Sequence, residues 1–206
     1  MKAIKEVMSW IIPVIIGLAI AFVIKSFVFT RVRVDGPSME PNLQNNEKVF
    51  AWKQAKVKHL SVIVFDAHGE DPSAKANTNY VKRVIGMPGD SIRYSKTGKL
   101  YVNGKYQSQN YISKYEQQWG TLSGYNNGFN LVTAARQNDW SNKWSLAIGN
   151  NRVNKVPKNC YFVLGDHRSV SEDSRVYGFV PKSKLVGVVK VGFWKSNHKI
   201  INDYQN

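Results

Sequence analysis

An uninterrupted apolar run near the N-terminus constrains this chain more than any other feature. Residues 7–24 contain no charged side chain. As a helix rising about 1.5 Å per residue, the run reaches about 27 Å, close to the thickness of the hydrocarbon core of a bilayer. A cleaved secretory signal is the alternative, but the small residues that a cleavage site needs are missing after Ile24. We therefore expect residues 1–30 to be an uncleaved membrane anchor.

The rest of the chain, residues 31–206, is long enough for one domain with its own core. Basic residues flank the anchor on both sides, so its orientation is not set by charge. The net charge is +15, from 29 Lys and Arg against 14 Asp and Glu, and such a surplus attracts polyanions. No nucleic-acid-binding motif is present. Because the chain carries an anchor, we expect membrane lipid or cell-wall polymers, and not nucleic acid, as the anionic partner.

Metal, cofactor and disulfide chemistry find no support in the sequence. The four histidines show no paired ligand spacing, so neither a metal nor a cofactor is expected. The single cysteine, Cys160, excludes an internal disulfide, and its apolar neighbours indicate a buried strand residue rather than a nucleophile.

Short apolar runs separated by turn residues predict a mainly β domain. The expected strands are residues 28–34, 49–52, 62–65, 80–85, 91–94, 100–102, 161–164 and 185–194. Asn103-Gly104, directly after residues 100–102, is a strong hairpin signal. Residues 106–152 are rich in Asn, Gln, Gly and Trp and alternate weakly, which favours a small inserted subdomain or cap.

Three segments carry the candidate chemistry. Residues 35–41 read Asp-Gly-Pro-Ser-Met-Glu-Pro, a turn that follows a strand and can present the Ser38 hydroxyl. Taken alone, a serine beside Gly and Pro is usually only a turn residue.

The second segment, residues 80–90, reads Tyr-Val-Lys-Arg-Val-Ile-Gly-Met-Pro-Gly-Asp. Lys82 lies within an apolar strand, where desolvation should lower its pKa. Arg83 is equally embedded, so alternation alone does not choose which of the two points inward, but arginine does not lose its proton and cannot act as a base. The alternative is a lysine on an edge strand whose amine reaches solvent.

The third segment, residues 165–175, reads Gly-Asp-His-Arg-Ser-Val-Ser-Glu-Asp-Ser-Arg after an apolar strand. It fits a structured polar loop at a site, or an ordinary charged surface loop. In this order behind one anchor, the three segments together resemble the type I signal peptidases, and Val156-Pro157 and residues 161–164 match that family too. The resemblance covers most of the chain outside residues 106–152.

The resemblance implies a signal-peptidase-like β domain on the extracytoplasmic side of a single-pass anchor. It implies a serine endopeptidase that removes N-terminal signal peptides from exported preproteins, with Ser38 as nucleophile and Lys82 as general base. Ser171 matches the serine that orients the lysine. The positions expected to hold the site together are Asp166, Arg168, Asp173 and Arg175. Those expected to line the pockets for small substrate side chains are Val32, Val34, Met39, Leu43 and Val81.

Three positions depart from the family pattern. His167 replaces the usual asparagine, and residues 59–61 read His-Leu-Ser in place of Arg-Gly-Asp. Gly36 occupies a position that in some members is a serine donating to the oxyanion. The oxyanion is therefore expected to depend chiefly on the Ser38 backbone N–H.

A neutral lysine suffices to activate the serine. Lowering a lysine pKa from about 10.4 to about 7 corresponds to roughly 4.6 kcal/mol, which burial can supply. A histidine-based hydrolase lacks its Gly-x-Ser-x-Gly elbow. A self-cleaving serine/lysine regulator needs a DNA-binding half, where this chain has an apolar run. The remaining alternative is a catalytically inactive, membrane-anchored surface protein that binds anionic polymers.

Overall fold

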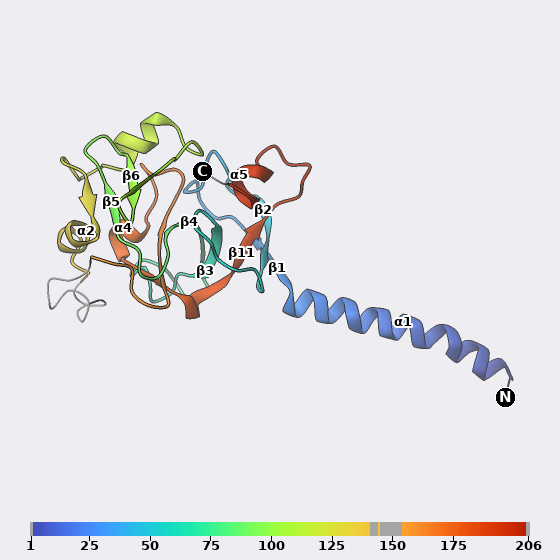
Figure 1. Cartoon of the computed structure of the whole chain (residues 1–206). Coiled ribbons are helices and arrows are strands. Elements are labelled where there is room, and N and C mark those ends of the chain that lie inside the picture. The colour runs from blue at the N-terminus through green and yellow to red at the C-terminus, as the bar shows by residue number, and fades with distance from the viewer. Residues whose placement is uncertain (1, 141–143, 145–153, 205–206) are drawn as a thin grey trace.

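The computed structural model describes residues 2–140, 144 and 154–204, and its most conspicuous feature is one long helix that projects from a β body (Figure 1). This helix, α1, spans Lys2–Phe27. Between residues 8 and 22 its large apolar side chains are exposed; Trp10, for example, is 79% exposed and Phe22 70%. Among the described residues, no helix combines the length and hydropathy required of a membrane span.

The main sheet has seven antiparallel strands in the order β1-β2-β11-β3-β4-β9-β10. The strands are β1 Phe29–Arg33, β2 Lys48–Trp52, β3 Val62–Asp66, β4 Asn79–Gly86, β9 Cys160–Leu164, β10 Val180–Pro181 and β11 Leu185–Lys190. Each strand predicted for these stretches is confirmed, although β11 ends earlier than expected. The chain turns after it, with the Lys195 N–H bonding the Gly192 carbonyl at 3.0 Å, and then forms α5 (His198–Asn202).

A second sheet of four antiparallel strands lies on the side of the body away from α1 (Figure 1). Its order is β7-β6-β5-β8, with β5 Ile92–Tyr94, β6 Leu100–Val102, β7 Lys105–Gln107 and β8 Phe129–Asn130. The predicted hairpin joins β6 to β7. Asn103 and Gly104 have φ of 51° and 78°, the left-handed values that a two-residue hairpin turn requires.

Short helices occupy the connections. They are the π-helix η1 Glu116–Gly120, α2 Leu131–Gln137, α4 Ser174–Tyr177 and the 3₁₀ helix η2 Lys182–Lys184. Each spans two turns or fewer, too short for a 3.6-residue periodicity to show in the sequence. Of the predicted inserted segment 106–152, residues 141–143 and 145–152 lie outside the described part.

The main sheet curls, so that its first strand approaches the fifth in the sheet order. Val34, just after β1, and Val81, in β4, belong to one buried cluster although three strands separate β1 from β4. Two further clusters fill the body, one against the second sheet and one on the opposite face of β3 and β4. The curl brings the turn that follows β1 to the end of β9.

Candidate active site

Strand β4 is buried on both faces and carries two neighbouring cations. The Lys82 side chain is 3% exposed and that of Arg83 is 0%. Successive side chains of a strand point to opposite faces, so the two cations lie in different environments. Alternation could not choose which of Lys82 and Arg83 points inward, and in the structure both side chains are buried.

Each nitrogen of the Arg83 guanidinium has at least one acceptor. Its Nε and Nη2 donate to the two carboxylate oxygens of Asp166 at 2.8 and 2.7 Å. Its Nη1 donates to the Leu60 and Ile200 carbonyls, and its guanidinium lies 4.3 Å from the centre of the Tyr111 ring. This bidentate pair is the geometry in which a buried arginine is best compensated.

Lys82 has no comparable partner. Within the described residues, no hydrogen bond or ion pair reaches its Nζ atom, which lies 5.2 Å from the centre of the Tyr80 ring. Burial lowers the pKa of Lys82 to about 8, against an opposing contribution from Asp173. This value brings the amine much closer to the working pH than an ordinary lysine, as a general base requires.

Ser38 sits in the turn between β1 and β2 and is partly buried. The turn is closed by the Glu40 N–H, which donates to the Pro37 carbonyl at 3.0 Å. The backbone N–H of His167 donates to the Ser38 carbonyl at 3.0 Å, and His167 Nδ1 lies 3.3 Å from the Pro37 carbonyl. The turn is thus fastened to the loop that follows β9.

Gly165 is the point at which the three motifs meet. Arg83 pairs with Leu164 in the antiparallel β4–β9 register, so continuing that register by one residue sets Gly165 opposite Lys82, on the same face. A Cβ on Gly165 would lie 2.2 Å from Ser171 Oγ and 2.5 Å from the Ser38 carbonyl oxygen. The Ser171 hydroxyl and the Ser38 backbone therefore occupy the space that a side chain at 165 would take, beside Lys82.

The Ser171 hydroxyl is buried and has no hydrogen-bond partner among the described residues. Its backbone is fixed at both ends, because its N–H donates to the His167 carbonyl and its carbonyl accepts from Arg175. The Ser171 hydroxyl is thus held rigidly on the Lys82 face without a partner among the described residues.

The remaining residues predicted to support the site are all buried, and three of them, Arg168, Asp173 and Arg175, hold the 165–175 loop. Asp173 pairs with Arg175 and accepts the Gly165 N–H at 3.1 Å. Burial alone would raise the pKa of Asp173, but the Arg175 guanidinium holds it below its usual value. Arg175 also donates to the Arg168 carbonyl at 2.6 Å. Asp166 instead serves Arg83 on the opposite face of β4.

Arg168 ties the loop to the second sheet, through the Tyr94 hydroxyl of β5 at 3.4 Å, and to the segment that follows β7. Its Nε donates to the Gly165 carbonyl at 2.8 Å. Its Nη atoms donate to the Gln109 side chain, the Thr121 hydroxyl and the Tyr111 hydroxyl at 3.0, 2.9 and 2.9 Å. Residues of the 106–152 segment thereby help to fix the candidate active-site loop.

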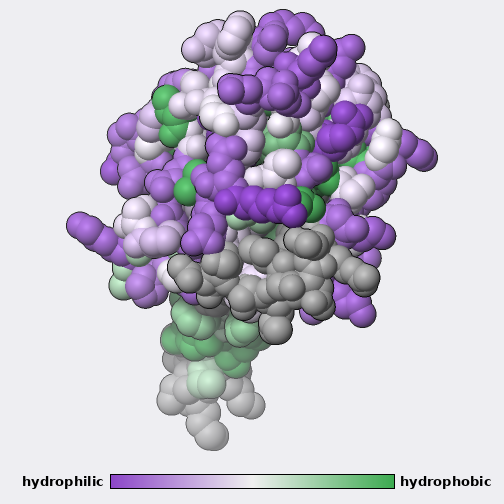
Figure 2. All heavy atoms as spheres, turned by 90° about the vertical axis from the view of Figure 1, so that its left-hand side faces the viewer, coloured by the Kyte–Doolittle hydropathy of each residue, from purple (hydrophilic) through white to green (hydrophobic). Residues whose placement is uncertain are grey.

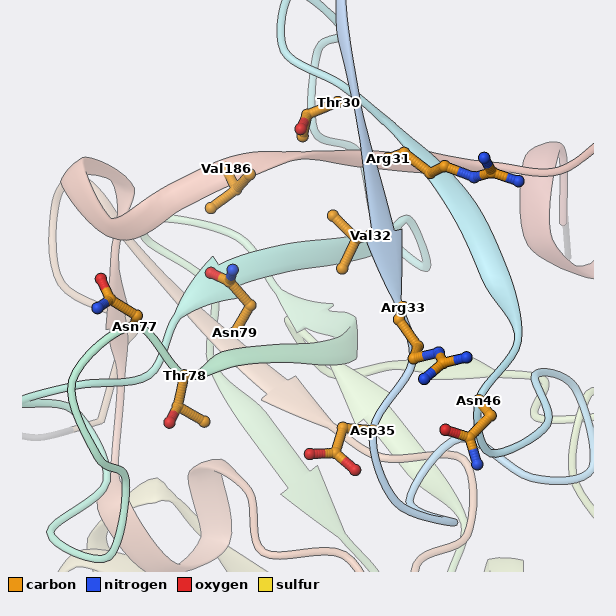
Figure 3. Close-up of a pocket in the computed structure, with 10 residues that line it drawn as sticks. All are labelled: Thr30, Arg31, Val32, Arg33, Asp35, Asn46, Asn77, Thr78, Asn79 and Val186. Carbon is orange, nitrogen blue, oxygen red and sulfur yellow. The ribbon is translucent and has the colours of Figure 1, made fainter.

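The five predicted pocket residues come together, but most of them are covered. Val34, Met39, Leu43 and Val81 are buried members of one cluster, and Val32 packs against it while partly exposed. Val32 also lines a groove with a volume of about 560 Å³ between β1, the start of β4 and β11. In Figure 3, Val32, Asn79 and Val186 face the hollow from these three elements and Arg31 points away.

Several structural partners escaped the sequence-based prediction. Asn42 donates to Asp166 at 2.8 Å and to the Tyr111 carbonyl at 2.7 Å, and it is buried. Gly165 leaves room for the Ser171 hydroxyl and the Ser38 backbone because it has no side chain. No local pattern marks either residue, because their roles arise only from contacts between distant segments.

Two of the three departures from the family pattern, Gly36 and residues 59–61, have defined local geometry. Gly36 adopts φ of 80°, and its N–H donates to the Asn45 side chain at 3.1 Å, so this N–H is already engaged. His59 pairs with Asp90 at 2.6 Å. Leu60 stands in the left-handed region with φ of 66°, where the family's usual glycine carries no strain.

Comparison with known proteins shows similarity to one family over most of the chain. The family model described as signal peptidase, peptidase S26, matches residues 7–194. Signal peptidase IB of Staphylococcus aureus (strain COL) is 34% identical over 197 residues, which cover 92% of this chain and 91% of the relative. Signal peptidase I of Bacillus caldolyticus is 33% identical and covers 88% of each chain.

Among solved structures, a signal peptidase I from Enterococcus faecalis V583 is 28% identical, with a TM-score of 0.47, and covers 65% of this chain and 97% of the other. The family match and the S. aureus relative decide the assignment: the chain belongs to the signal peptidases of family S26. It is a serine peptidase with signal peptidase I activity, as its three motifs predicted.

Proposed function

We propose that Ser38 and Lys82 form the catalytic dyad of this signal peptidase. Neutral Lys82 takes the proton of the Ser38 hydroxyl as its oxygen attacks the scissile carbonyl, and an acyl-enzyme forms as the amine product leaves with a proton from Lys82. Water, activated by the same amine, then hydrolyses the ester and restores Ser38. The Ser38 backbone N–H is the principal donor to the oxyanion.

One observation carries this proposal. Lys82 is a desolvated amine without a hydrogen-bonding partner among the described residues, and it shares its face of β4 with the Ser171 hydroxyl and the Ser38 backbone, which meet over Gly165. A structural lysine in such a position would be expected to have a carboxylate partner, as Arg83 has.

The other predicted residues act by positioning. Ser171 orients the Lys82 amine with its uncommitted hydroxyl. Asp173 and Arg175 fix the loop that carries Ser171, and Arg168 fastens this loop to the second sheet. Asp166 neutralises Arg83 and keeps that cation away from the base.

The substrate lies extended along the groove beside β1, with small side chains directed at Val32 and the cluster beneath it. The groove reaches Asp35, which shortly precedes Ser38 in the chain. The buried state of Val34, Met39, Leu43 and Val81 leaves little depth for a side chain. This shallowness favours alanine-sized residues at the −1 and −3 positions of a preprotein.

The N-terminal helix anchors the enzyme in the membrane, with the catalytic domain on the extracytoplasmic side. Support comes from the uncharged run 7–24 and from the exposed apolar side chains of α1, which contrast with the hydrophilic surface of the body in Figure 2. Such a helix needs an apolar medium around it. We expect the full chain to stay with the membrane fraction after alkaline extraction, whereas a variant lacking residues 1–27 should be released from it.

The decisive experiment is cleavage of a labelled preprotein by the full chain in detergent. Ser38→Ala and Lys82→Met should each lower kcat/KM by at least about 10⁴-fold, because either change removes a group that acts as part of a unit. Ser183→Ala and Lys99→Met, both at exposed positions, are the matched controls and should cleave normally. Cleavage by either dyad variant at the wild-type rate would remove that residue from the mechanism.

A further inference from the structure

A buried carboxylate without a basic partner lies in the loop between β3 and β4. Asp71 is 1% exposed. Its Oδ1 accepts the backbone N–H and the hydroxyl of Ser73 at 2.7 and 2.8 Å, and its Oδ2 accepts the Tyr80 hydroxyl at 2.8 Å. Among the described residues, no Lys, Arg or His forms an ion pair with it.

Tyr80 connects this carboxylate to Lys82. The two residues are two positions apart in β4 and so point to the same face. The Lys82 Nζ atom lies 5.2 Å from the centre of the Tyr80 ring, and the hydroxyl of that ring donates to Asp71. Burial, with the neighbouring Asp71 carboxylate, raises the pKa of Tyr80 to about 12, so the phenol stays neutral and remains a donor.

We propose that Asp71 and Tyr80 form a positioning couple that sets the strength of Lys82 as a base. The carboxylate holds and polarises the phenol, and together they present negative charge to the amine through the face of the ring. This inference rests on the proposed role of Lys82 as the general base. It assigns to Asp71 and Tyr80 an indirect role, through the amine, without contact with the substrate.

The charged groups around Lys82 explain why Asp71 has a distinct effect. Asp173, Asp71 and Glu172 favour the ammonium form of Lys82, whereas Arg175 disfavours it. Asp173 is paired with Arg175, and Glu172 is exposed to water, which screens its charge. Asp71 alone among the three carboxylates is both buried and without a cationic partner among the described residues. The nearby Tyr177 phenol stays neutral, because burial raises its pKa well above its ordinary value.

The couple counteracts an excess of desolvation. Burial lowers the pKa of the amine, and a base whose pKa falls far below the working pH transfers protons poorly. A fixed negative charge behind the ring raises the affinity of the amine for the proton. The enzyme thereby gains base strength without placing a carboxylate in direct contact with Lys82, which would lock it as an ion pair.

The competing explanation is that Asp71 only stabilises its own turn through Ser73. A turn residue would change stability and leave the titration of Lys82 untouched. The acid limb of the pH profile of kcat/KM reports that titration in the free enzyme, so it separates the two roles.

The experiment measures kcat/KM against pH for the full chain in detergent with a signal-peptide substrate, in wild type, Asp71→Asn and Tyr80→Phe. Removing the charge makes the ammonium less favourable, so we expect the acid limb of Asp71→Asn to move to lower pH by about 0.5 to 1 unit. Tyr80→Phe keeps the ring but removes the hydrogen bond from the Tyr80 hydroxyl to Asp71, and should move the acid limb in the same direction. The matched control is Asp66→Asn, at the end of β3, whose carboxylate bonds Lys184 and the His68 N–H and not Tyr80.

The outcomes are distinct. A shift in Asp71→Asn and Tyr80→Phe but not in Asp66→Asn supports the couple. Acid limbs at the wild-type pH in both variants overturn it, even while Ser38→Ala and Lys82→Met remain inactive and the dyad stands. Thermal unfolding identifies a variant that does not fold; if Asp71→Asn fails this check, the conservative Tyr80→Phe decides, and an unshifted limb there also overturns the proposal.

Discussion

The two faces of β4 treat two adjacent cations in opposite ways. On one face, Arg83 is surrounded by acceptors and forms a bidentate pair with Asp166. On the other face, Lys82 lies over the Tyr80 ring, and Gly165 brings the Ser171 hydroxyl and the Ser38 backbone to the same side of the strand. Both side chains are buried to nearly the same extent.

The difference between these faces shows that burial alone does not define a catalytic residue. A buried cation with a complete set of partners stabilises the fold and is chemically inert. A buried cation without partners is destabilised in its charged form, and that cost is what makes it a base. The predictions below test this contrast.

The largest effect on stability is expected from Arg83→Met. It would leave the Asp166 carboxylate buried with only Asn42 as a side-chain partner, and breaking a buried pair in this way costs about 3–5 kcal/mol. Chemical denaturation should show the loss as a lower midpoint. An unfolding free energy close to that of the wild type would mean that Arg83 is not needed to compensate Asp166.

Gly165→Ala should disturb catalysis, because Gly165 lies beside Lys82 and contacts both Ser171 and Ser38. The added methyl group would fall 2.2 Å from Ser171 Oγ and 2.5 Å from the Ser38 carbonyl oxygen, so both must move. Displacement of about 1 Å in a reacting group can cost about 100-fold in rate. We expect a loss of that order in kcat/KM in preprotein cleavage; activity within a factor of two of wild type would contradict the packing described around Gly165.

Lys82→Met should have the opposite sign from Arg83→Met in an unfolding experiment. A folded-state pKa of about 8 against an ordinary value of 10.5 corresponds to a penalty of about 3 kcal/mol for the charged amine at neutral pH. Methionine has a similar length and no charge, so we expect the unfolding free energy at pH 7 to rise by about 1–3 kcal/mol while cleavage is lost. A destabilised Lys82→Met protein would show that the amine has a structural partner after all.

The smallest expected effect is the contribution of Lys82 to the pH dependence of stability, which the Lys82→Met variant lacks. The pKa of Lys82 is lower in the folded than in the unfolded chain, so the unfolded chain binds more protons between about pH 8 and 10.5, and stability rises with pH. From pH 7 to 9 the wild type should gain about 1 kcal/mol relative to Lys82→Met. Parallel curves for the two proteins would place the Lys82 pKa near its unfolded value.

Much of the fold followed from local patterns. The alternating runs predicted the strands of the main sheet, and Asn103-Gly104 predicted the β6–β7 hairpin, because strand and turn preferences act over a few residues. The short helices α2 and α4 were not predicted, since they are too brief for a periodicity to appear. The three motifs also identified the family, because each is long enough to be distinctive.

The candidate site could be named from sequence only through that resemblance. The alternation in residues 80–85 could not separate Lys82 from Arg83, and the turn at Ser38 was by itself unremarkable. The roles of Asn42, Gly165 and Asp71 had no local signal, since each depends on a partner in another part of the fold: Asp166, Ser171 and Tyr80, respectively.

The sequence by itself determined the strands, the apolar N-terminal run and the three motifs, because these depend on residue type and spacing along the chain. Only the tertiary structure decided which cation of β4 would receive a carboxylate and which would be left without one. That choice is made by the curl of the sheet and by the loop after β9, which set Asp166 against Arg83 and Gly165 beside Lys82. Solvation and partnership are properties of a site in three dimensions, and they distinguish the structural cation from the proposed base.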